Sequence, residues 1–324
     1  MGEKAPANHA VTTIIKSKTA SHPESFPVVL RRAFLTGGSG YIGHHVVKQL
    51  ATAGWKVAVL TRPSTDVSNL ANLNLDFFQD DGTNGYIDIA IGRFMPDVVF
   101  HLAAVFDNES PDGIQRMVDA NLKLGIQLLE SMRRHNCKYL VNTGTFSSYS
   151  TNGDPYPLSL YAAMKLAMEQ IIDYHSLSSG LCAVTLNLCD VYGPTDWRPK
   201  LLNLIKDAMR TGKPLHLTPG YQLMNFLHVN DVAAAFITAA EDIVNLNNGQ
   251  HVKYSVSSPE QISVRNLVGK VQAISKNNVP VVFGGKPYRD IEIMVPWHGN
   301  LLPNWEPKID LENGLRELLS MNSD

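Results

Sequence analysis

The sequence predicts an α/β protein organised around a doubly wound parallel sheet, and two observations lead to this prediction. Continuous apolar runs alternate with helical patterns from residue 26 to residue 188, which is typical of parallel strands covered by helices on both faces. The first apolar run, 26–35, also leads into a glycine-rich turn at 36–43 and then into a helical pattern. Strand, glycine-rich turn and helix in this order indicate a dinucleotide-binding unit.

The expected elements follow from local patterns along the chain. Apolar runs place strands at 26–35, 55–60, 75–78, 96–101, 139–141, 181–188 and 215–217. Helical patterns lie after residue 41, over 119–135, from 161 to about 175, over 200–210, up to about 243, and after 263. Gly54 is expected to end the first helix. Ser263 is expected to be the N-cap of the helix that begins directly after residue 263.

The turn at 36–43 is the expected binding site for the pyrophosphate of a dinucleotide. Gly37 allows a tight turn, Gly40 lets the backbone approach a pyrophosphate, and Gly43 lets the helix pack against the strand. The N-terminus of that helix presents free N–H groups and the positive end of its dipole to phosphates. We assign cofactor binding to Gly37, Ser39, Gly40, Tyr41, Ile42 and Gly43.

The end of the second strand favours NADP(H) over NAD. An acidic residue at this place usually holds the ribose 2′-hydroxyl of NAD, but the chain carries Thr61 followed by Arg62. A guanidinium can grip a 2′-phosphate with paired hydrogen bonds, whereas a carboxylate would repel it. The alternative is that Arg62 is only a solvated cation of the loop.

Further cofactor contacts are expected along the same edge of the sheet. Small residues follow the fourth strand, where they would let a cofactor lie against the strand end. The residues assigned to this part of the site are Ser64, Asp81, Leu102, Ala103, Ala104 and Asn121.

A hydroxyl-rich strand end and a Tyr–Lys pair mark the expected catalytic centre. The strand at 139–141 is followed by the run 142–148, which carries Thr143 and Thr145. Tyr161 and Lys165 lie one helical turn apart, so the phenol and the ammonium share a face. A nearby cation is expected to lower the pKa of the phenol and make it a better acid or base.

Composition excludes several other classes of protein. The chain has 324 residues, of which 44% are hydrophobic and 18% are charged, so the core is ample. The formal net charge of −2 gives no sign of a nucleic-acid partner, and no apolar run approaches the roughly 20 residues that cross a bilayer. Residues 1–25 are polar and are expected to form a mobile tail. The three cysteines lack metal or redox spacing, which fits a cytoplasmic protein without a metal site.

Four motifs in order resemble the extended short-chain dehydrogenases/reductases, the NAD(P)-dependent nucleotide-sugar epimerase/dehydratase family. They are Thr36-Gly37-Gly38-Ser39-Gly40-Tyr41-Ile42-Gly43, His101-Leu102-Ala103-Ala104, Tyr161-x-x-x-Lys165 and Val191-Tyr192-Gly193-Pro194. The resemblance covers residues 30 to 320. It implies a Rossmann domain, 26–185 plus 225–255, and a smaller C-terminal α/β domain, 186–224 plus 256–324, that binds a nucleotide-diphosphate sugar. It also implies a catalytic triad of Thr143, Tyr161 and Lys165, and a homodimer formed through a helix bundle.

The sequence departs from the family pattern at three places. Family dehydratases follow the triad threonine with an Asp-Glu pair, whereas Gly144 and Thr145 stand here and neither transfers a proton at neutral pH. Asp190 replaces a common asparagine, and the segment 190–200 looks most like the CDP-paratose and CDP-abequose synthases. Met224 replaces a usual arginine of the sugar-nucleotide site. The expected substrate contacts are therefore Thr145, Asp190, Arg198, Lys200 and Arg289, although each of these cations could instead be a solvated surface group.

The resemblance and these departures lead to one expected function with two alternatives. The expected function is NADPH-dependent reduction of a nucleotide-linked 4-keto-6-deoxyhexose to the 4-hydroxy sugar. In it, Tyr161 protonates the forming alkoxide, Thr143 hydrogen-bonds the carbonyl oxygen, and Lys165 holds the nicotinamide ribose. The first alternative is a nucleotide-sugar 4-epimerase that uses the same residues. The second is a non-catalytic NADP-binding subunit on the same fold.

Overall fold

The computed structural model describes residues 30–83 and 85–320, and its centre is a seven-stranded sheet with strand order β10-β6-β5-β4-β1-β2-β3. All neighbouring strands of this sheet pair in parallel. The strands are β1 (Arg32–Thr36), β2 (Lys56–Thr61), β3 (Leu75–Gln79), β4 (Val98–His101), β5 (Tyr139–Thr145), β6 (Cys182–Leu188) and β10 (His251–Val256). The predicted doubly wound sheet is confirmed.

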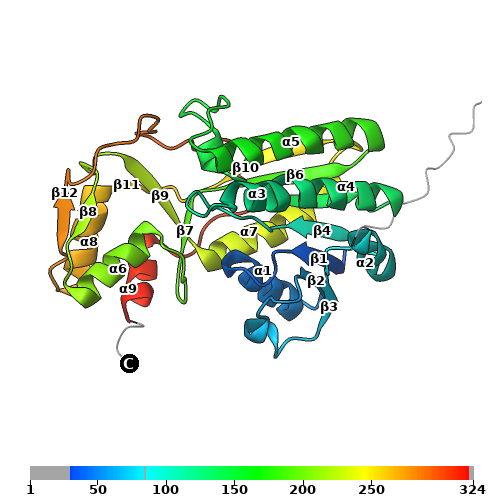
Figure 1. Ribbon diagram of the computed structural model, residues 1–324, viewed down its shortest axis with the longest axis horizontal. Helices are drawn as coiled ribbons and strands as arrows, with labels where there is room; N and C mark the ends of the chain where they lie inside the picture. The colour runs from blue at the N-terminus through cyan, green and yellow to red at the C-terminus, as the bar shows by residue number, and fades with distance from the viewer. Residues whose placement is uncertain (1–29, 84, 321–324) are drawn as a thin grey trace, which may run out of the picture.

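Helices cover both faces of the large sheet, as the continuous apolar strands require. On one face lie α1 (Tyr41–Thr52) and α7 (Val229–Asp242), whose buried side chains share a core with β1, β2 and β6. On the other face lie α2 (Tyr86–Phe94), α4 (Leu124–Arg134) and α5 (Leu160–Ser179). Figure 1 shows this arrangement, with α4 and α5 above the sheet and α1 and α7 below it.

The helix expected at 119–135 is longer and contains a π-helical turn. It begins as α3 (Gly113–Val118), passes through the π-helical turn η2 (Asp119–Lys123) and continues as α4. Such turns are rare and are frequent at functional sites. This one carries Asn121, whose side chain reaches across to the segment that follows β4.

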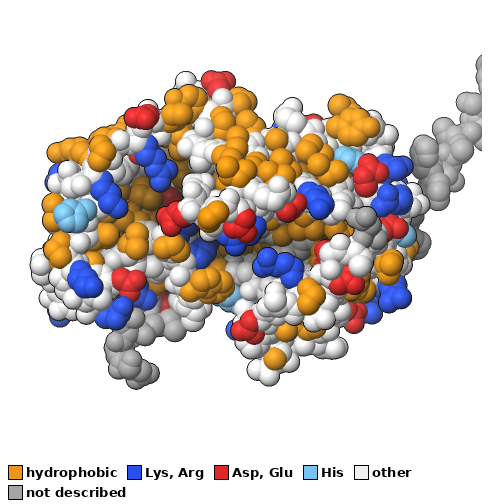
Figure 2. Space-filling view, viewed as in Figure 1, with side chains coloured by type: hydrophobic (Ala, Val, Ile, Leu, Met, Phe, Trp, Pro, Cys, Tyr) orange, Lys and Arg blue, Asp and Glu red, His pale blue; other side chains and the backbone are white. Residues whose placement is uncertain are grey.

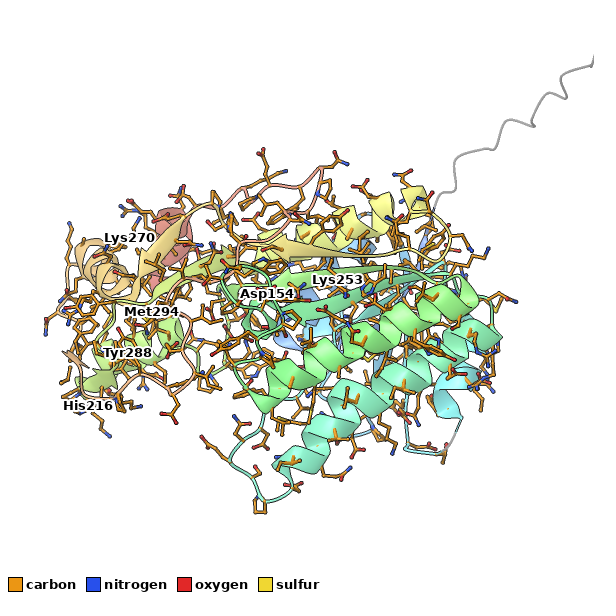
Figure 3. All side chains as sticks on the ribbon, turned by 90° about the horizontal axis from the view of Figure 1, so that it is seen from above. Asp154, His216, Lys253, Lys270, Tyr288 and Met294 are labelled. Atoms are coloured by element: carbon orange, nitrogen blue, oxygen red, sulfur yellow. The ribbon has the colours of Figure 1, made fainter. Side chains whose placement is uncertain are left out.

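Two smaller sheets form the other end of the molecule. The first has the order β11-β9-β7 and consists of β7 (Asp190–Tyr192), β9 (Leu223–His228) and β11 (Gln261–Ser263). The second pairs β8 (Leu215–Leu217) with β12 (Val281–Phe283). They pack with α6 (Leu201–Thr211), α8 (Val264–Ser275) and α9 (Leu311–Ser320) around a separate apolar core. In the view of Figure 3, His216, Tyr288 and Met294 lie at this end of the molecule.

Several local expectations can be compared with the structure. The side chain of Ser263 accepts a hydrogen bond from the amide of Asn266, which confirms it as the N-cap of α8. β5 extends to Thr145 instead of ending at residue 141, because residues 142–145 continue the ladder with β6. The proposed domain boundary between 224 and 225 falls inside β9. The expected tail, residues 1–25, and the start of the first expected strand lie outside the described residues.

In the described part of the chain, three short 3₁₀ helices connect the larger elements: η1 (Ser68–Leu70), η3 (Phe146–Ser148) and η4 (Ile243–Asn245). Cys137, Cys182 and Cys189 are buried and free. Across 30–83 and 85–320, no helix combines the length and the apolar character needed to span a membrane.

Candidate active site

In the glycine-rich turn between β1 and α1, two glycines stand where no side chain would fit. Gly37 has a φ of +71°, and a Cβ there would lie 2.5 Å from the amide nitrogen of Ala103. A Cβ on Gly43 would lie 2.0 Å from the carbonyl oxygen of Gly37. Gly40 caps α1 without a side-chain hydrogen bond, and the first turn of α1 carries no acidic residue. The turn therefore fits the pyrophosphate of a dinucleotide, which binds to free N–H groups at a helix N-terminus.

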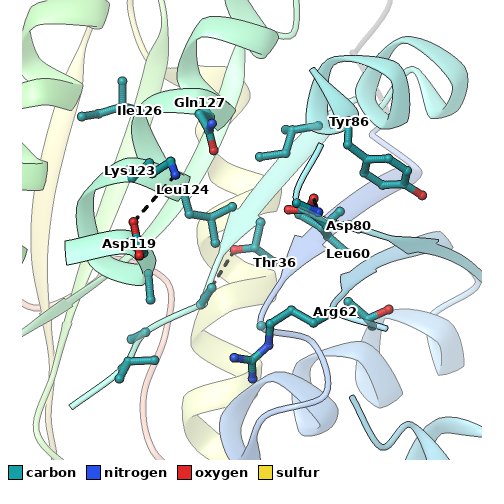
Figure 4. A pocket seen from close by; sticks show the side chains of 18 of the residues that line it. Thr36, Leu60, Arg62, Asp80, Tyr86, Asp119, Lys123, Leu124, Ile126 and Gln127 are labelled. Atoms are coloured by element: carbon teal, nitrogen blue, oxygen red, sulfur yellow. Dashed lines mark hydrogen bonds and ion pairs between the residues drawn. The ribbon is translucent and has the colours of Figure 1, made fainter. Parts of the chain in front are cut away.

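A cavity of about 940 Å³ lies next to this turn, at the carboxyl ends of β1, β2 and β4. Its volume is at the upper end of the range typical of ligand sites. It lies where the strand order reverses between β1 and β4, which is where open α/β sheets bind ligands. In Figure 4, Arg62 and Asp80 lie on one side of Thr36, and Asp119 and Lys123 on the other. Figure 2 shows the surface hollowed between the upper helices and the lower part of the large sheet.

The lining of the cavity includes part of the predicted cofactor set. The assigned residues that line it are Gly37, Ser39, Gly40, Arg62, Leu102, Ala103 and Ala104. The assigned residues outside its lining are Tyr41, Ile42, Gly43, Ser64, Asp81 and Asn121. Asp81 accepts a hydrogen bond from the amide of Thr83, while its neighbours Asp80 and Gly82 contact the cavity.

Arg62 has a free guanidinium at the end of β2. Its side chain is exposed and makes no hydrogen bond or ion pair with another residue of the described chain. Its backbone is fixed, because its amide donates to the hydroxyl of Thr65 at 3.1 Å. Asp80, at the end of the adjacent strand β3, contributes a carboxylate to the same lining. The same lining therefore holds a free cation at the end of β2 and a carboxylate at the end of β3.

Asn121 positions the segment after β4 instead of lining the cavity. Its side-chain amide donates to the carbonyl of Val105 at 2.7 Å, and its side-chain oxygen accepts from the Val105 amide at 3.1 Å. At the start of this segment, the amide of Ala103 donates to the hydroxyl of Thr36 at 3.3 Å (Figure 4). Both ends of the segment that contacts the cavity are therefore held by side chains.

The predicted Tyr–Lys pair lies at the start of α5. Ser159 caps this helix by accepting a hydrogen bond from the amide of Ala162. Tyr161 is half-buried, and the Nζ atom of Lys165 lies 5.9 Å from the centre of its ring. Phe106, directly after the cavity-lining segment, places its ring edge-on to Tyr161 at 5.6 Å. The pair therefore lies beside the cavity, although neither residue is part of its lining.

The two candidate threonines of β5 differ in their partners. The hydroxyl of Thr143 is buried and has no hydrogen-bond partner among the described residues. The hydroxyl of Thr145 lies 2.9 Å from that of Ser147 and also accepts from the Ser147 amide, so it caps η3. Of the two hydroxyls, that of Thr143 is the one left unpaired.

Burial dominates the ionisation of the Tyr–Lys pair. It raises the pKa of Tyr161 to about 12, and Arg198 is the cation that opposes this rise. It lowers the pKa of Lys165 to about 8, and the carboxylate of Glu169 opposes this fall. The expectation that Lys165 lowers the pKa of Tyr161 is therefore wrong, because removal of the phenol from water outweighs the effect of a neighbouring charge.

Gly144 explains why no acid stands after Thr143. A Cβ at this position would lie 2.1 Å from the side-chain oxygen of Asn187 on the paired strand β6. A side chain at residue 144 would therefore collide with the amide of Asn187.

The segment after β7 is tied to the glycine-rich turn by Arg198. The guanidinium binds both carboxylate oxygens of Asp196, donates to the carbonyl of Val191, and stacks over the ring of Tyr41 at 4.4 Å. The Tyr41 hydroxyl donates to the carbonyl of Pro194 at 3.3 Å. Most donors of Arg198 are therefore engaged within the protein.

The other expected substrate residues are less engaged. Lys200 lies 4.0 Å from Asp190, whose pKa is raised by burial and held down in part by Lys200 and Arg198. Arg289 is exposed, in the loop after β12, and makes no ion pair with a described residue. Met224, which replaces the usual arginine, packs against the small core and leaves no cation there.

Two neighbours of the Tyr–Lys pair, Phe106 and Glu169, were not identified from the sequence. A signal for Glu169 was present, because it follows Lys165 by one further helical turn on the same face. Phe106 carried no signal beyond its place after the small residues at 102–104. Within the described ranges, no group of three or more His, Cys, Asp or Glu side chains could hold a metal ion.

Comparison with known proteins shows similarity along nearly the whole chain. The model of the NAD dependent epimerase/dehydratase family matches residues 33–270. The chain is 28% identical over 275 residues to a CDP-abequose synthase of Yersinia pseudotuberculosis, covering 82% of this chain and 91% of that protein. It is 25% identical over 303 residues to a UDP-glucose 4-epimerase of Streptomyces lividans, covering 84% of this chain and 90% of that protein.

Solved structures of similar fold include nucleotide-sugar epimerases. The UDP-glucose 4-epimerase of Thermus thermophilus, in complex with NAD, has a TM-score of 0.77 at 26% identity and covers 90% of this chain and 100% of that one. The enzyme of Brucella ovis, also with NAD, has a TM-score of 0.79 at 18% identity, with 90% and 98% coverage, which shows the shared fold alone.

Proposed function

Because the chain belongs to the NAD dependent epimerase/dehydratase family, we propose that it is an NADPH-dependent reductase of a nucleotide-linked 4-keto-6-deoxyhexose. The observation that carries this choice is the free guanidinium of Arg62 in the cavity lining. It suits a 2′-phosphate, and NADPH suits net reduction better than a redox-neutral epimerisation. The similarity to CDP-abequose synthases supports the same choice.

The chemistry assigned to each side chain follows from its surroundings. When bound, NADPH would supply the hydride that reaches C4 of the sugar. Tyr161 donates a proton to the C4 oxygen, and a pKa of about 12 keeps its phenol protonated and able to donate at neutral pH. The unpaired hydroxyl of Thr143 is available to hydrogen-bond the C4 oxygen. Lys165 is the buried ammonium that would bind the nicotinamide ribose.

Elimination of water is disfavoured by the shape of β5. A dehydratase needs a second acid and base beside the triad, and the close approach of Asn187 to Gly144 leaves no room for a carboxylate there. The protein would then act on a keto sugar made by another enzyme.

We assign the sugar nucleotide to the smaller domain, 186–224 plus 256–324. Lys200 and Arg289 are the cations with donors to spare for a diphosphate, and Asp190 is an acceptor beside Lys200. Arg198 would contribute chiefly by holding the segment 190–200 against the glycine-rich turn. Three buried free thiols suit a reducing compartment, and we place the protein in the cytoplasm.

The second candidate is a nucleotide-sugar 4-epimerase, favoured by the similarity to UDP-glucose 4-epimerases. The two candidates differ in their balance of cofactor. A reductase consumes one NADPH for each sugar, whereas an epimerase oxidises and then reduces the same carbon with no net consumption.

The test is to supply NADPH with CDP- or dTDP-4-keto-6-deoxyglucose freshly made by a dehydratase. We expect stoichiometric loss of nicotinamide absorbance and a 4-hydroxy product identified by NMR. Interconversion of two 4-hydroxy sugars without net loss of NADPH would establish the epimerase. Binding of NADPH without turnover of either class of sugar would favour a non-catalytic subunit.

A further inference from the structure

One face of α5 carries four ionisable side chains in succession. Tyr161, Lys165, Glu169 and Asp173 follow one another at intervals of one helical turn. The first two belong to the proposed reaction, but the role of the other two is unassigned. Glu169 is 0% exposed, which is exceptional for a carboxylate unless it is paired.

Glu169 is held from two directions. The hydroxyl of Tyr149, from the segment after η3, donates to its Oε2 atom, and the Nζ atom of Lys253, from β10, lies 3.6 Å from the same oxygen. In Figure 3, Lys253 lies beside α5. Burial raises the pKa of Glu169, and the Tyr149 hydrogen bond and the Lys253 charge oppose that rise. The Oε1 atom is buried and has no hydrogen-bond partner among the described residues.

Tyr149 and Lys253, the two partners of Glu169, are held in place by further contacts. Tyr149 stacks on Trp297, with ring centres 4.6 Å apart, and Trp297 comes from the loop after β12. Lys253 also pairs with Asp173 at 3.0 Å, and Asp173 bonds His251 of β10 at 2.6 Å. A buried carboxylate held by this many contacts is fixed in position next to the turn of α5 that carries Lys165.

Burial lowers the pKa of Lys165, so its ammonium loses a proton more readily than that of an exposed lysine. It is 2% exposed, and burial has brought its pKa down to about 8. From β4 it faces His101, whose pKa is lowered to about 3 by burial and by Lys165, so that this imidazole is neutral. On its own helix, Tyr161, a neutral phenol, and Glu169 each lie one turn from Lys165, and the carboxylate of Glu169 forms its ion pair with Lys253. Among the described residues, Glu169 is the carboxylate that favours the charged form of Lys165.

We propose that Glu169 is a positioning residue that keeps the buried Lys165 ammonium charged, and that Tyr149 and Lys253 hold Glu169 for this purpose. This inference rests on the proposed role of Lys165 in the reaction. Glu169 touches no reacting atom and acts only through Lys165. Asp173 serves instead to link β10 to α5, through His251 and Lys253.

The sign of the expected effect follows from the charges. The ammonium form of Lys165 is the active one, so activity falls as pH rises through the pKa of Lys165. Removal of the Glu169 charge lowers that pKa, and the alkaline limb of the pH profile moves to lower pH. A charged neighbour in a buried site is worth about one pKa unit or more.

The experiment compares Glu169→Gln with the matched control Asp173→Asn, one turn further along α5. The full chain, without cofactor, is labelled with ¹³C-lysine, and the Lys165 signal is assigned by its loss in Lys165→Arg. We expect the NMR titration of Lys165 in Glu169→Gln to move down by about one pH unit or more, and the alkaline limb of kcat/KM to move with it. In Asp173→Asn we expect lower thermal stability but an unchanged Lys165 titration.

An unchanged Lys165 titration in folded Glu169→Gln would overturn the proposal, as would an equal shift in Asp173→Asn. If Glu169→Gln does not fold, Tyr149→Phe keeps the ring on Trp297 and removes the hydroxyl that donates to Glu169. A smaller shift in the same direction is expected there, and no shift would overturn the proposal. The titration of Lys165 needs no substrate. It therefore tests the effect of Glu169 on Lys165 even if the proposed reaction is not observed.

Discussion

At the scale of single residues, burial outweighs neighbouring charge at the Tyr–Lys pair. The phenol of Tyr161 has a pKa of about 12 and the amine of Lys165 a pKa of about 8, each shifted toward its neutral form. Tyr161 is therefore suited to donate a proton at neutral pH, and Lys165 is close to losing its charge. Arg62 is the opposite case, an exposed cation without a partner in the described chain.

We expect Tyr161→Phe to lower turnover by about two orders of magnitude or more, the typical value of general acid catalysis. The ring remains, so NADPH should still bind in a fluorescence titration. Tyr174→Phe, on the exposed side of the same helix, is the control and should keep full activity. Near wild-type turnover of Tyr161→Phe on the true substrate would show that another group donates the proton.

We expect the wild-type protein to prefer NADPH over NADH, and Arg62→Ala to remove most of that preference. Hydrogen bonds to a charged group are worth about 1.5–3 kcal/mol, which corresponds to roughly tenfold to hundredfold in affinity. Titration of both cofactors against Arg62→Ala and against Arg93→Ala, an arginine outside the cavity lining, checks this. Equal affinities of the wild type for the two cofactors would contradict the assignment.

At the scale of elements, the pairing of β5 with β6 restricts which side chains β5 can carry into the site. The strand carries Thr143, whose hydroxyl is unpaired, next to Gly144, whose Cα faces the amide of Asn187. The π-helical turn η2 acts in the same way, because it presents Asn121 to the segment that contacts the cavity. In both cases the element fixes the backbone of the site, and β5 also supplies the hydroxyl of Thr143.

We expect Gly144→Ala to destabilise the protein by about 1–3 kcal/mol, the usual cost of overpacking a tight site. Its new Cβ would collide with the side-chain oxygen of Asn187. Gly269→Ala, in α8 with no atom within 4 Å of its new Cβ, is the matched control and should leave stability unchanged or slightly higher. Urea unfolding measures both variants. A Gly144→Ala protein as stable as the wild type would show that β5 and β6 can move apart at little cost.

At the scale of the whole molecule, the cavity depends on the order of the strands. β1 lies between β2 and β4 in the sheet. After β1 the chain forms β2 and β3 on one side, and it then crosses to form β4 and the remaining strands on the other side. The strand order therefore reverses between β1 and β4, and an opening lies at the carboxyl ends of these strands. The small sheets add a second core at the end of β6 and β7, where the segment 190–200 reaches back to the glycine-rich turn. The smaller part, to which we assign the sugar nucleotide, is tied to the large sheet through this segment.

We expect the protein to form a homodimer through α4 and α5, which lie side by side on one face of the sheet (Figure 1). This face exposes Leu177 (86%) and Tyr174 (64%) on α5. Light scattering should give twice the chain mass, and Leu177→Glu should give the single-chain mass. Ile89→Glu, an exposed apolar position on α2, is the control and should remain dimeric. A wild-type protein of single-chain mass at micromolar concentration would contradict this expectation.

Much of the fold could be predicted because the patterns that determine it are local. Apolar runs located six strands of the large sheet, but β10 was not identified. The glycine-rich turn located one end of the cavity, and the ends of the second and fourth strands located Arg62 and Ala103 in its lining. The π-helical turn, the extension of β5 and the pairing of β9 with β7 were not predicted. They depend on contacts between segments far apart in the chain.

The order of residues alone is enough to establish the strand–turn–helix unit, the spacing of Tyr161 and Lys165, and the lack of an acid at residue 144, since each depends on neighbours along the chain. How these groups ionise, and which of them are free, is set by the folded arrangement. Arg198 is engaged by Asp196 and Tyr41, Lys165 is removed from water, and Glu169 is brought between Tyr149 and Lys253. Desolvation and pairing depend on what surrounds a side chain in space, and α5, β4, β5 and β10 come together only in the folded protein.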